Sequence, residues 1–443
     1  MKNINRRNFV KKTAMAGIGL SVFMSGNSAW AFSPNETVNV AIIGTGGRSY
    51  ALIKALSFNK NNKVTVACDV DRERLDKFVT EAENNFGFKI KKEGDFRKIL
   101  SNKDIDAVFI VTPEHWHAPM AIMSMQAGKH VYVEKPCSHN LAENNLLVAA
   151  QQQYGKVCQM GNQQRSSVTS SEAVNKINDG IIGKAYFARA WYANTRGSIG
   201  IGEKITVPST LNWDLWQGPA PRQEYYNNIH PYHWHWFKKW GTGEIHNNGT
   251  HEIDICRWAL GVNYPNRVVS TGGRYAFNDD WEFYDTQNVE FDFDDKTIAW
   301  EGRSCNGKKL FNRDRGAIVY GTEGSVILDR AGYEIFDLAG NLKDTATEGS
   351  GSAATSSADT TGFDTLTVAH VGNFLSAIRE SLPLNAPIVD ASISTHLCHL
   401  GNIAQELKST LKVDVNSGDV LDNDRASNLW SREYENGWEP SID

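Results

Sequence analysis

Residues 39–49 read NVAIIGTGGRS, a short apolar run that leads into a glycine-rich turn. An apolar run of this length is typical of a strand buried on both faces of a parallel sheet. Gly44 and Gly46 fit a G-x-G pattern, and Ser49 stands where a third glycine is usual. The first glycine permits a tight turn, and the second lets the backbone approach a pyrophosphate. N–H groups at the start of the following helix can bind the phosphates, so this stretch predicts a dinucleotide-binding fold.

An acidic residue follows at the expected distance. Asp69 lies twenty residues beyond Ser49 and closes a second predicted strand over residues 64–68. A carboxylate there accepts hydrogen bonds from a ribose 2′-hydroxyl and repels a 2′-phosphate, which favours NAD over NADP. Arg72 lies close enough to weaken that preference, and a simple turn formed by Asp69 and Asp71 is the alternative.

The predicted strands and helices follow different orders in the two halves of the chain. Strands over 108–111 and 130–133, with amphipathic segments between them, predict βαβ units and a parallel α/β sheet. In the second half we expect strands over 185–192, 267–272, 288–293, 297–303 and 317–320, and helices over 366–380 and 392–411. The Gly/Ser/Thr/Ala-rich stretch 345–361 predicts a flexible surface loop.

The N-terminus has the features of an export signal. NRRNFVKK at residues 5–12 precedes an 11-residue apolar run over 14–24, and Ala29-Trp30-Ala31 supplies a small-x-small cleavage pattern. We interpret residues 1–31 as a twin-arginine signal cut after Ala31, with an ordinary secretory signal as the alternative. The predicted location is therefore the bacterial periplasm, and no later apolar stretch is long enough to span a membrane.

Composition limits the partners of the chain. Hydrophobic residues make up 41% of the 443 residues, so the chain can bury a large core and is not disordered. The net charge is −5, and it becomes −10, from 41 basic and 51 acidic residues, once residues 1–31 are removed. This balance argues against nucleic acid, whose binders need a basic face, and fits a neutral small molecule.

Three further motifs carry a resemblance to a known family. They are TPEHWH at 112–117, VEKP at 133–136 and GEIHNNGTHEID at 243–254. With the glycine turn, they make residues 38–412 resemble the Gfo/Idh/MocA family, named for glucose–fructose oxidoreductase and inositol dehydrogenase. The resemblance implies an N-terminal Rossmann domain over 38–160 and an α+β domain with an open, mainly antiparallel sheet over 161–412. It also implies a homodimer or homotetramer, and we expect the tail 413–443 to pack on the domains.

The resemblance also implies a set of catalytic residues. Lys135 takes the place of the family's catalytic lysine, whose ammonium can hydrogen-bond the reacting oxygen. His251 matches the active-site histidine, and a neutral imidazole can take the proton from a secondary alcohol. Asn247 stands where many members carry Asp, and an amide can orient a hydroxyl but cannot act as a base. Arg165 matches a position near the cofactor, and we place His117 at the nicotinamide edge. The cofactor-binding candidates are Gly44, Gly46, Gly47, Arg48, Asp69, Thr112, Pro113, His117, Glu134, Lys135 and Arg165.

An aromatic stretch over 230–240 is a candidate substrate site. His233, Trp234 and His235 combine flat apolar faces with polar tips, which a sugar site needs, and Trp213 belongs to a stretch that we expect to border the same cleft. Plain packing is the first alternative. A metal site using His233, His235 and His246 is the second. His233 and His235 would face the same side of a strand, but the spacing supplies no fixed third ligand, so we predict no metal.

The implied reaction is hydride transfer between NAD and a carbon of a sugar, polyol or glycoside. Because an exported enzyme has no dependable NAD pool to exchange with, we expect tightly held NAD that is restored in each cycle. One such cycle couples two sugars. Another oxidises a glycoside, eliminates its leaving group, adds water and reduces the product, as some exported relatives of this chain do. A sugar-binding protein that holds NAD without catalysis is the alternative from a different class.

Overall fold

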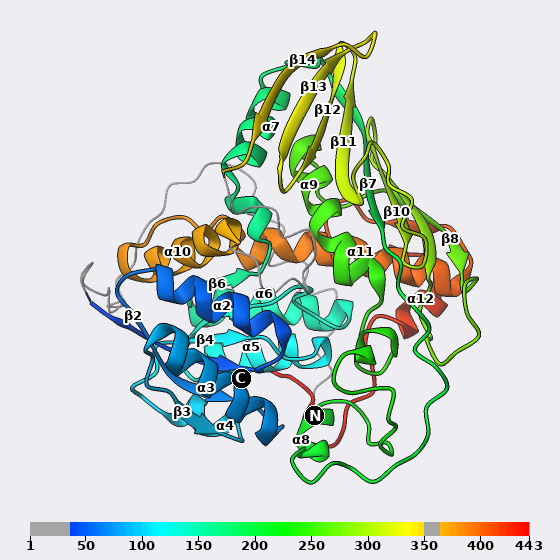
Figure 1. Cartoon of the computed structure of the whole chain (residues 1–443). Coiled ribbons are helices and arrows are strands. Elements are labelled where there is room, and N and C mark those ends of the chain that lie inside the picture. The colour runs from blue at the N-terminus through cyan, green and yellow to red at the C-terminus, as the bar shows by residue number, and fades with distance from the viewer. Residues whose placement is uncertain (1–35, 350–363, 443) are drawn as a thin grey trace.

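The computed structural model describes residues 36–349 and 364–442, which fold around two sheets (Figure 1). The predicted signal over 1–31 lies outside the described residues, as does most of the predicted loop over 345–361. The predicted fold class is confirmed, because a parallel α/β sheet is joined to a second domain with a mainly antiparallel sheet.

The first sheet has the strand order β3-β2-β1-β4-β5-β6, and every neighbouring pair is parallel. Its strands are β1 (Val38–Ile43), β2 (Asn62–Cys68), β3 (Lys91–Glu93), β4 (Ala107–Ile110), β5 (His130–Val133) and β6 (Cys158–Met160). The helices between them are α2 (Gly47–Phe58), α3 (Arg72–Phe86), α4 (Arg97–Ser101), α5 (His117–Gln126) and α6 (Leu141–Tyr154). Side chains of β1 are buried on both faces, as the continuous apolar run predicts.

Local sequence signals set the ends of these helices. Asp71 caps α3 by accepting hydrogen bonds from the backbone of Glu73 and Arg74, and Gly87 ends it in the left-handed conformation. Asn140 and Gly155 play the same two roles for α6.

The second sheet has ten strands in the order β14-β13-β12-β11-β7-β10-β9-β8-β15-β16, of which only the β7–β10 pair is parallel among the described residues. The strands are β7 (Ala185–Ala193), β8 (Arg267–Gly273), β9 (Thr286–Asp292), β10 (Thr297–Arg303), β11 (Arg315–Gly321), β12 (Gly324–Asp329), β13 (Gly332–Asp337), β14 (Leu342–Thr347), β15 (Leu411–Val413) and β16 (Val420–Leu421). The helices of this half are α7 (Val168–Asn178), α8 (Trp213–Gln217), α9 (Thr250–Leu260), α10 (Thr365–Glu380), α11 (Ile388–Leu407) and α12 (Asp424–Asn428).

Two helices from late in the chain return to the first sheet. In Figure 1, α10 and α11 lie between the two sheets. Phe374 of α10 packs edge-on against Phe109 of β4, with ring centroids 5.4 Å apart, inside the core of the first domain. The Rossmann domain predicted over 38–160 is therefore completed by residues that we assigned to the second domain.

Three sequence predictions differ from the structure. The first residues of the predicted loop, Thr345 to Thr347, belong to β14 and pair with β13. The helix predicted over 392–411 begins at Ile388 and ends at Leu407, because Leu411 pairs with Val268 of β8. His233 and His235, weighed as strand residues for a metal site, lie instead on a 3₁₀ turn, η3 (His233–Trp236).

The tail packs on both domains, since β16 and Ala426 belong to the second domain and the residues from Arg432 onward pack on the first. Arg432 donates a hydrogen bond to the carbonyl of His115 and pairs with Glu143 of α6 at 2.6 Å. Trp438 packs edge-on against Trp116, with ring centroids 5.0 Å apart. No helix of the described residues is long and apolar enough to span a membrane.

Candidate active site

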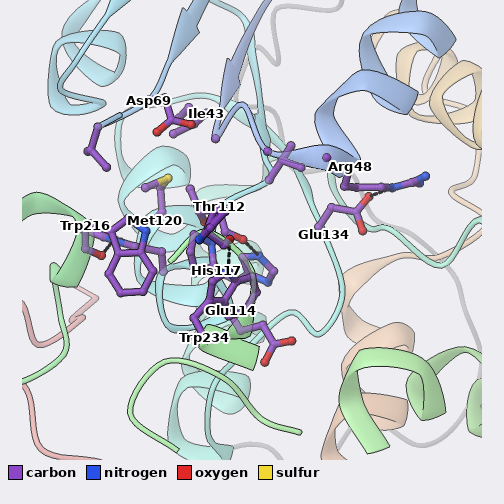
Figure 2. A pocket seen from close by; sticks show the side chains of 18 of the residues that line it. Ile43, Arg48, Asp69, Thr112, Glu114, His117, Met120, Glu134, Trp216 and Trp234 are labelled. Atoms are coloured by element: carbon purple, nitrogen blue, oxygen red, sulfur yellow. Dashed lines mark hydrogen bonds and ion pairs between the residues drawn. The ribbon is translucent and has the colours of Figure 1, made fainter. Parts of the chain in front are cut away.

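A cavity of about 400 Å³ opens at the carboxyl ends of the parallel strands, and both domains line it (Figure 2). In Figure 2, Asp69 lies at one end, Glu114 and Trp234 lie toward the other, and the Arg48–Glu134 pair lies at one side. The predicted site residues that line it are Gly44, Gly46, Gly47, Arg48, Asp69, Thr112, Pro113, His117, Glu134, Lys135, Asn247, His251, Trp234 and His235. Carboxyl ends of strands are where α/β folds bind their ligands.

The glycine turn between β1 and α2 has the geometry that a dinucleotide needs. Gly44 has φ +92°, and a Cβ there would lie 2.5 Å from the carbonyl oxygen of Val111. Gly46 caps α2 without any side-chain hydrogen bond, and no acidic residue stands in the first turn of the helix. The positive end of the α2 dipole is therefore free to face a phosphate. Ser49 replaces the usual third glycine by bonding its hydroxyl back to the Gly46 carbonyl at 2.6 Å.

The ribose end of the cavity is built on Asp69. Its Oδ2 accepts hydrogen bonds from the backbone N–H of Thr45 at 2.7 Å and from the Thr45 hydroxyl at 2.8 Å. Each carboxylate oxygen has two lone pairs, so Asp69 keeps capacity for a ribose hydroxyl. Arg72, which weakened the preference for NAD, points elsewhere and donates to the carbonyl of Ser209, whereas Arg74 lines the cavity. Arg74 could not be identified as a cavity residue from the sequence, because the face of α3 that points to the cavity is known only once the helix is packed in the fold.

Buried polar atoms around the cavity lack partners. Thr112 Oγ1, Gln163 Oε1 and His251 Nδ1 have no hydrogen-bond partner among the described residues. All three residues line the cavity. Buried polar groups are normally hydrogen-bonded, so these atoms fit a polar ligand such as a dinucleotide with its substrate.

Lys135 joins the two domains at the centre of the site. Its Nζ donates to the backbone carbonyl of Asn247 at 2.5 Å and to Asn247 Oδ1 at 3.3 Å. Burial lowers the pKa of Lys135, while the charges of Glu114 and Glu134 oppose that shift. Asn247 lies on a π-helical turn, η4 (Ile245–Gly249), and its Nδ2 lies 3.4 Å from Glu244 Oε1. This contact turns the amide oxygen of Asn247 toward Lys135.

His251 follows that turn at the start of α9 and is 2% exposed. Burial holds the pKa of His251 well below its usual range, and the charges of Arg330, Lys135 and Arg315 lower it further. The ring is therefore neutral at pH 7, which is the state in which imidazole can accept a proton.

The aromatic stretch contributes only part of its length to the cavity. The His235 ring stacks on Trp234 with centroids 3.6 Å apart, and its Nδ1 lies 2.6 Å from the carbonyl oxygen of Tyr232. A carbonyl oxygen only accepts hydrogen bonds, so Nδ1 carries the proton and Nε2 of the neutral ring is an acceptor. His233 does not line the cavity, and Trp213 lies behind Trp216, on which it stacks at 4.7 Å.

Arg165 is the clearest correction to the predicted site, because it does not line the cavity. Its guanidinium donates to both carboxylate oxygens of Asp254, at 2.7 and 2.8 Å, and lies over the Trp258 ring. The family resemblance placed Arg165 near the cofactor, but the sequence could not show that Asp254 of α9 would face it. The pair connects the end of the first sheet with the second domain.

Replacing Arg165 with methionine is expected to destabilise the fold. Asp254 would keep a hydrogen bond from Ser394 at 2.6 Å but would lose its bidentate partner while it stays buried. Breaking a buried pair in this way costs about 3–5 kcal/mol. Chemical denaturation would measure the change, with Lys77→Met in an exposed pair as the control. A loss no larger than that of the control would contradict this structural role.

The protein is expected to lose stability in mild acid. All twelve histidines have a pKa lowered chiefly by burial, to about 3 for His115 and His246 and to about 4 for His370. Unfolded histidine has a pKa of about 6.5. Neutral histidines therefore contribute stability above pH ~6.5, and the unfolded state binds more protons as the pH falls. Glu114 and Asp106, whose pKa values are raised by burial, act in the opposite sense but are only two groups. Thermal melts should show Tm falling steeply between pH 6.5 and 5, and a flat Tm would contradict the argument.

Metal ligands are not assembled in the described part of the chain. Residues 36–349 and 364–442 contain no group of three His, Cys, Asp or Glu side chains that could hold a metal ion. His246, the third ligand of the alternative considered above, is fully buried beside His399, with ring centroids 4.2 Å apart.

Comparison with known families finds one match in each of the two domains. Residues 38–162 match the oxidoreductase family with an NAD-binding Rossmann fold, GFO/IDH/MocA. Residues 171–327 match the GFO/IDH/MocA C-terminal domain.

Curated relatives are similar over part of their length. A glycosyl hydrolase family 109 protein of Solibacter usitatus is 28% identical over 211 residues, which are 45% of this chain and 48% of the relative. Another, from Saccharopolyspora erythraea, is 29% identical over 208 residues, which are 42% and 45%. The chain thus matches about half the length of these relatives.

Solved structures share the fold over nearly the whole described chain. Levoglucosan dehydrogenase in complex with NADH and levoglucosan has a TM-score of 0.64 at 21% identity, covering 86% of this chain and all of that one. A putative myo-inositol dehydrogenase from Sinorhizobium meliloti has a TM-score of 0.61 at 17% identity, covering 85% and 100%. At these identities the likeness shows the fold alone.

Proposed function

The chain belongs to the Gfo/Idh/MocA oxidoreductases, and we propose that it oxidises a secondary hydroxyl of a sugar, polyol or glycoside. One observation carries this proposal. Lys135, Asn247 and His251 line the same cavity as the glycine turn and Asp69, so a hydroxyl and a dinucleotide can meet there.

Separate residues would bind the pyrophosphate and the ribose of the dinucleotide. The N-terminus of α2 with Gly44 and Gly46 would hold the pyrophosphate, and Asp69 would hold the ribose. When bound, NAD supplies a nicotinamide ring that accepts a hydride.

Lys135 and His251 would have different roles toward the reacting hydroxyl. The Lys135 ammonium would donate a hydrogen bond to the reacting oxygen, and Asn247 would hold that ammonium in place. His251, neutral at pH 7, would take the hydroxyl proton. Trp234 and His235 would line the sugar from the other domain.

A second candidate function is hydrolysis of a glycoside with NAD restored in each cycle. The match to glycosyl hydrolase family 109 proteins favours it. Oxidation of one carbon acidifies its neighbour, so that the leaving group departs by elimination. Water addition and return of the hydride then complete a hydrolysis without net redox change. Export through the signal that we propose for residues 1–31 would make such a closed cycle useful, because there is no dependable pool of NAD outside the cytoplasm.

Two measurements test these functions on the purified protein. Heat denaturation should release a nicotinamide dinucleotide that is detected by absorbance and mass, and its absence would contradict tight binding. Aryl glycosides are then supplied without any electron acceptor. Release of the aglycone would establish the hydrolytic cycle, and turnover only with an added acceptor would establish the dehydrogenase. Light scattering would test the proposed assembly into two or four copies.

A further inference from the structure

One buried carboxyl in the cavity has no role in the oxidation described above. Glu114 lies on the turn η1 (Glu114–Trp116) after β4 and is 2% exposed, yet it lines the cavity with Lys135. Its Oε2 accepts a hydrogen bond from the Thr242 hydroxyl at 2.5 Å. Among the described residues the Thr242 hydroxyl is the one side chain that donates to this carboxyl, and a backbone hydrogen bond from Thr242 adds to it. The two carboxylate oxygens have further lone pairs, so the group keeps acceptor capacity toward the cavity that it lines.

The charges around Glu114 suit proton exchange near neutral pH. Burial raises the pKa of Glu114 to about 7; Thr242 and Lys135 oppose the rise, and Glu244 adds to it. His115 and His117 follow the carboxyl along the chain, and burial lowers the pKa of both rings, while the Pro136 and Thr112 carbonyls oppose the shift at His117. A carboxyl of this kind can both accept and release a proton at pH 7.

Lys135 and Glu114 influence each other without touching. Glu114 is the first of the charges that oppose the lowering of the Lys135 pKa. Nevertheless, the ion pairs of the described residues include none between the two groups within 4.0 Å, and Lys135 bonds to Asn247 instead. A substrate held by Lys135 would therefore lie in the same cavity as a Glu114 carboxyl that is not paired with the Lys135 ammonium.

We infer that Glu114 is a second acid–base group of this cavity, which removes a proton from the carbon next to the ketone of an oxidised glycoside. The C–H bond breaks, its proton goes to the carboxylate, and its electron pair forms the enolate whose oxygen Lys135 holds. The enolate oxygen then re-forms the C=O bond, and the enolate C=C pair shifts to form a double bond to the carbon that bears the aglycone as the C–O bond to the aglycone breaks. The aglycone oxygen leaves with the bonding pair and takes up a proton from water. This step deepens the hydrolytic form of the proposed function and rests on it.

Solvent isotope exchange tests this step apart from hydride transfer. The intact protein is incubated in D2O with a glycoside already oxidised to its ketone, and deuterium uptake beside the carbonyl is followed by NMR. Glu114→Gln keeps the shape of the side chain but cannot take a proton, so exchange should fall by about 100-fold or more. Glu290→Gln, an exposed change on β9, should leave the rate unchanged. Dinucleotide content and Tm would verify that both variants are folded.

A second variant tests the role of the Thr242 hydroxyl. Thr242→Val removes a donor that lowers the pKa of Glu114, so the midpoint of the pH–exchange profile should move to higher pH. Wild-type exchange in Glu114→Gln, or no exchange in the wild type, would overturn the inference. Exchange that depends on Glu114 in a protein that oxidises no alcohol would support it while contradicting the proposed oxidation.

Discussion

Replacing Lys135 with methionine is expected to lower kcat by about 1,000-fold while the protein stays folded and keeps its dinucleotide. Methionine fills a similar volume but has no charge and donates no hydrogen bond. The oxygen of the reacting hydroxyl would then lose the ammonium that the two contacts to Asn247 hold in the cavity. Removing a single donor from such a site costs about 100- to 1,000-fold in rate, and loss of a charged donor belongs at the upper end of that range.

Single-turnover kinetics with the retained dinucleotide would measure this effect directly. Lys77→Met, on the exposed face of α3, is the matched control and should leave the rate unchanged. Activity above a tenth of wild type in the Lys135 variant would show that Lys135 only positions other groups. A protein that binds sugar without catalysis would lose little by the same change, so the variant also separates that class of function.

Replacing Gly44 with alanine is expected to destabilise the first domain by about 3 kcal/mol and to empty its dinucleotide site. The residue has φ +92°, and the added Cβ would lie 2.5 Å from the Val111 carbonyl oxygen at the end of β4. Backbone atoms cannot rotate away as a side chain can, so either the turn or β4 must move. Both elements border the cavity, and the cofactor site would change with them.

Gly87→Ala provides the control for backbone strain alone. Gly87 also has a positive φ, +71°, but nothing lies within 4 Å of a Cβ placed there. Its replacement should therefore cost only about 1 kcal/mol. Thermal melts and the dinucleotide content per protein would compare the two variants. Equal losses would mean that the contact with Val111 is of no consequence.

The parts of the fold that follow from local pattern could be predicted. The strands β1, β2, β4 and β5 are short apolar runs with clear ends, and their carboxyl ends place Gly44 and Asp69 at the cavity. Asp69 closes its strand, so its position along the sheet is decided by residues close to it in sequence. The same is true of Lys135, which lies two residues after the end of β5.

Other features depend on contacts between distant segments. Arg165 faces Asp254 only because α9 packs beside the turn that follows β6, and no local pattern records that meeting. Burial in the folded protein raises the pKa of Glu114, and its partner Thr242 comes from a segment 128 positions away in the sequence. The π-helical turn that carries Asn247 could not be predicted either, because it departs from the ordinary α-helical periodicity.

The return of α10 to the first sheet has a consequence for biosynthesis. Phe374 and Ile378 belong to the same core as Phe109 and β1, so the N-terminal domain of the nascent chain lacks part of its interior until about residue 380 has left the ribosome. The two domains therefore cannot finish folding one after the other during translation. The cavity, which residues of both domains line, is completed only after nearly the whole chain has been synthesised.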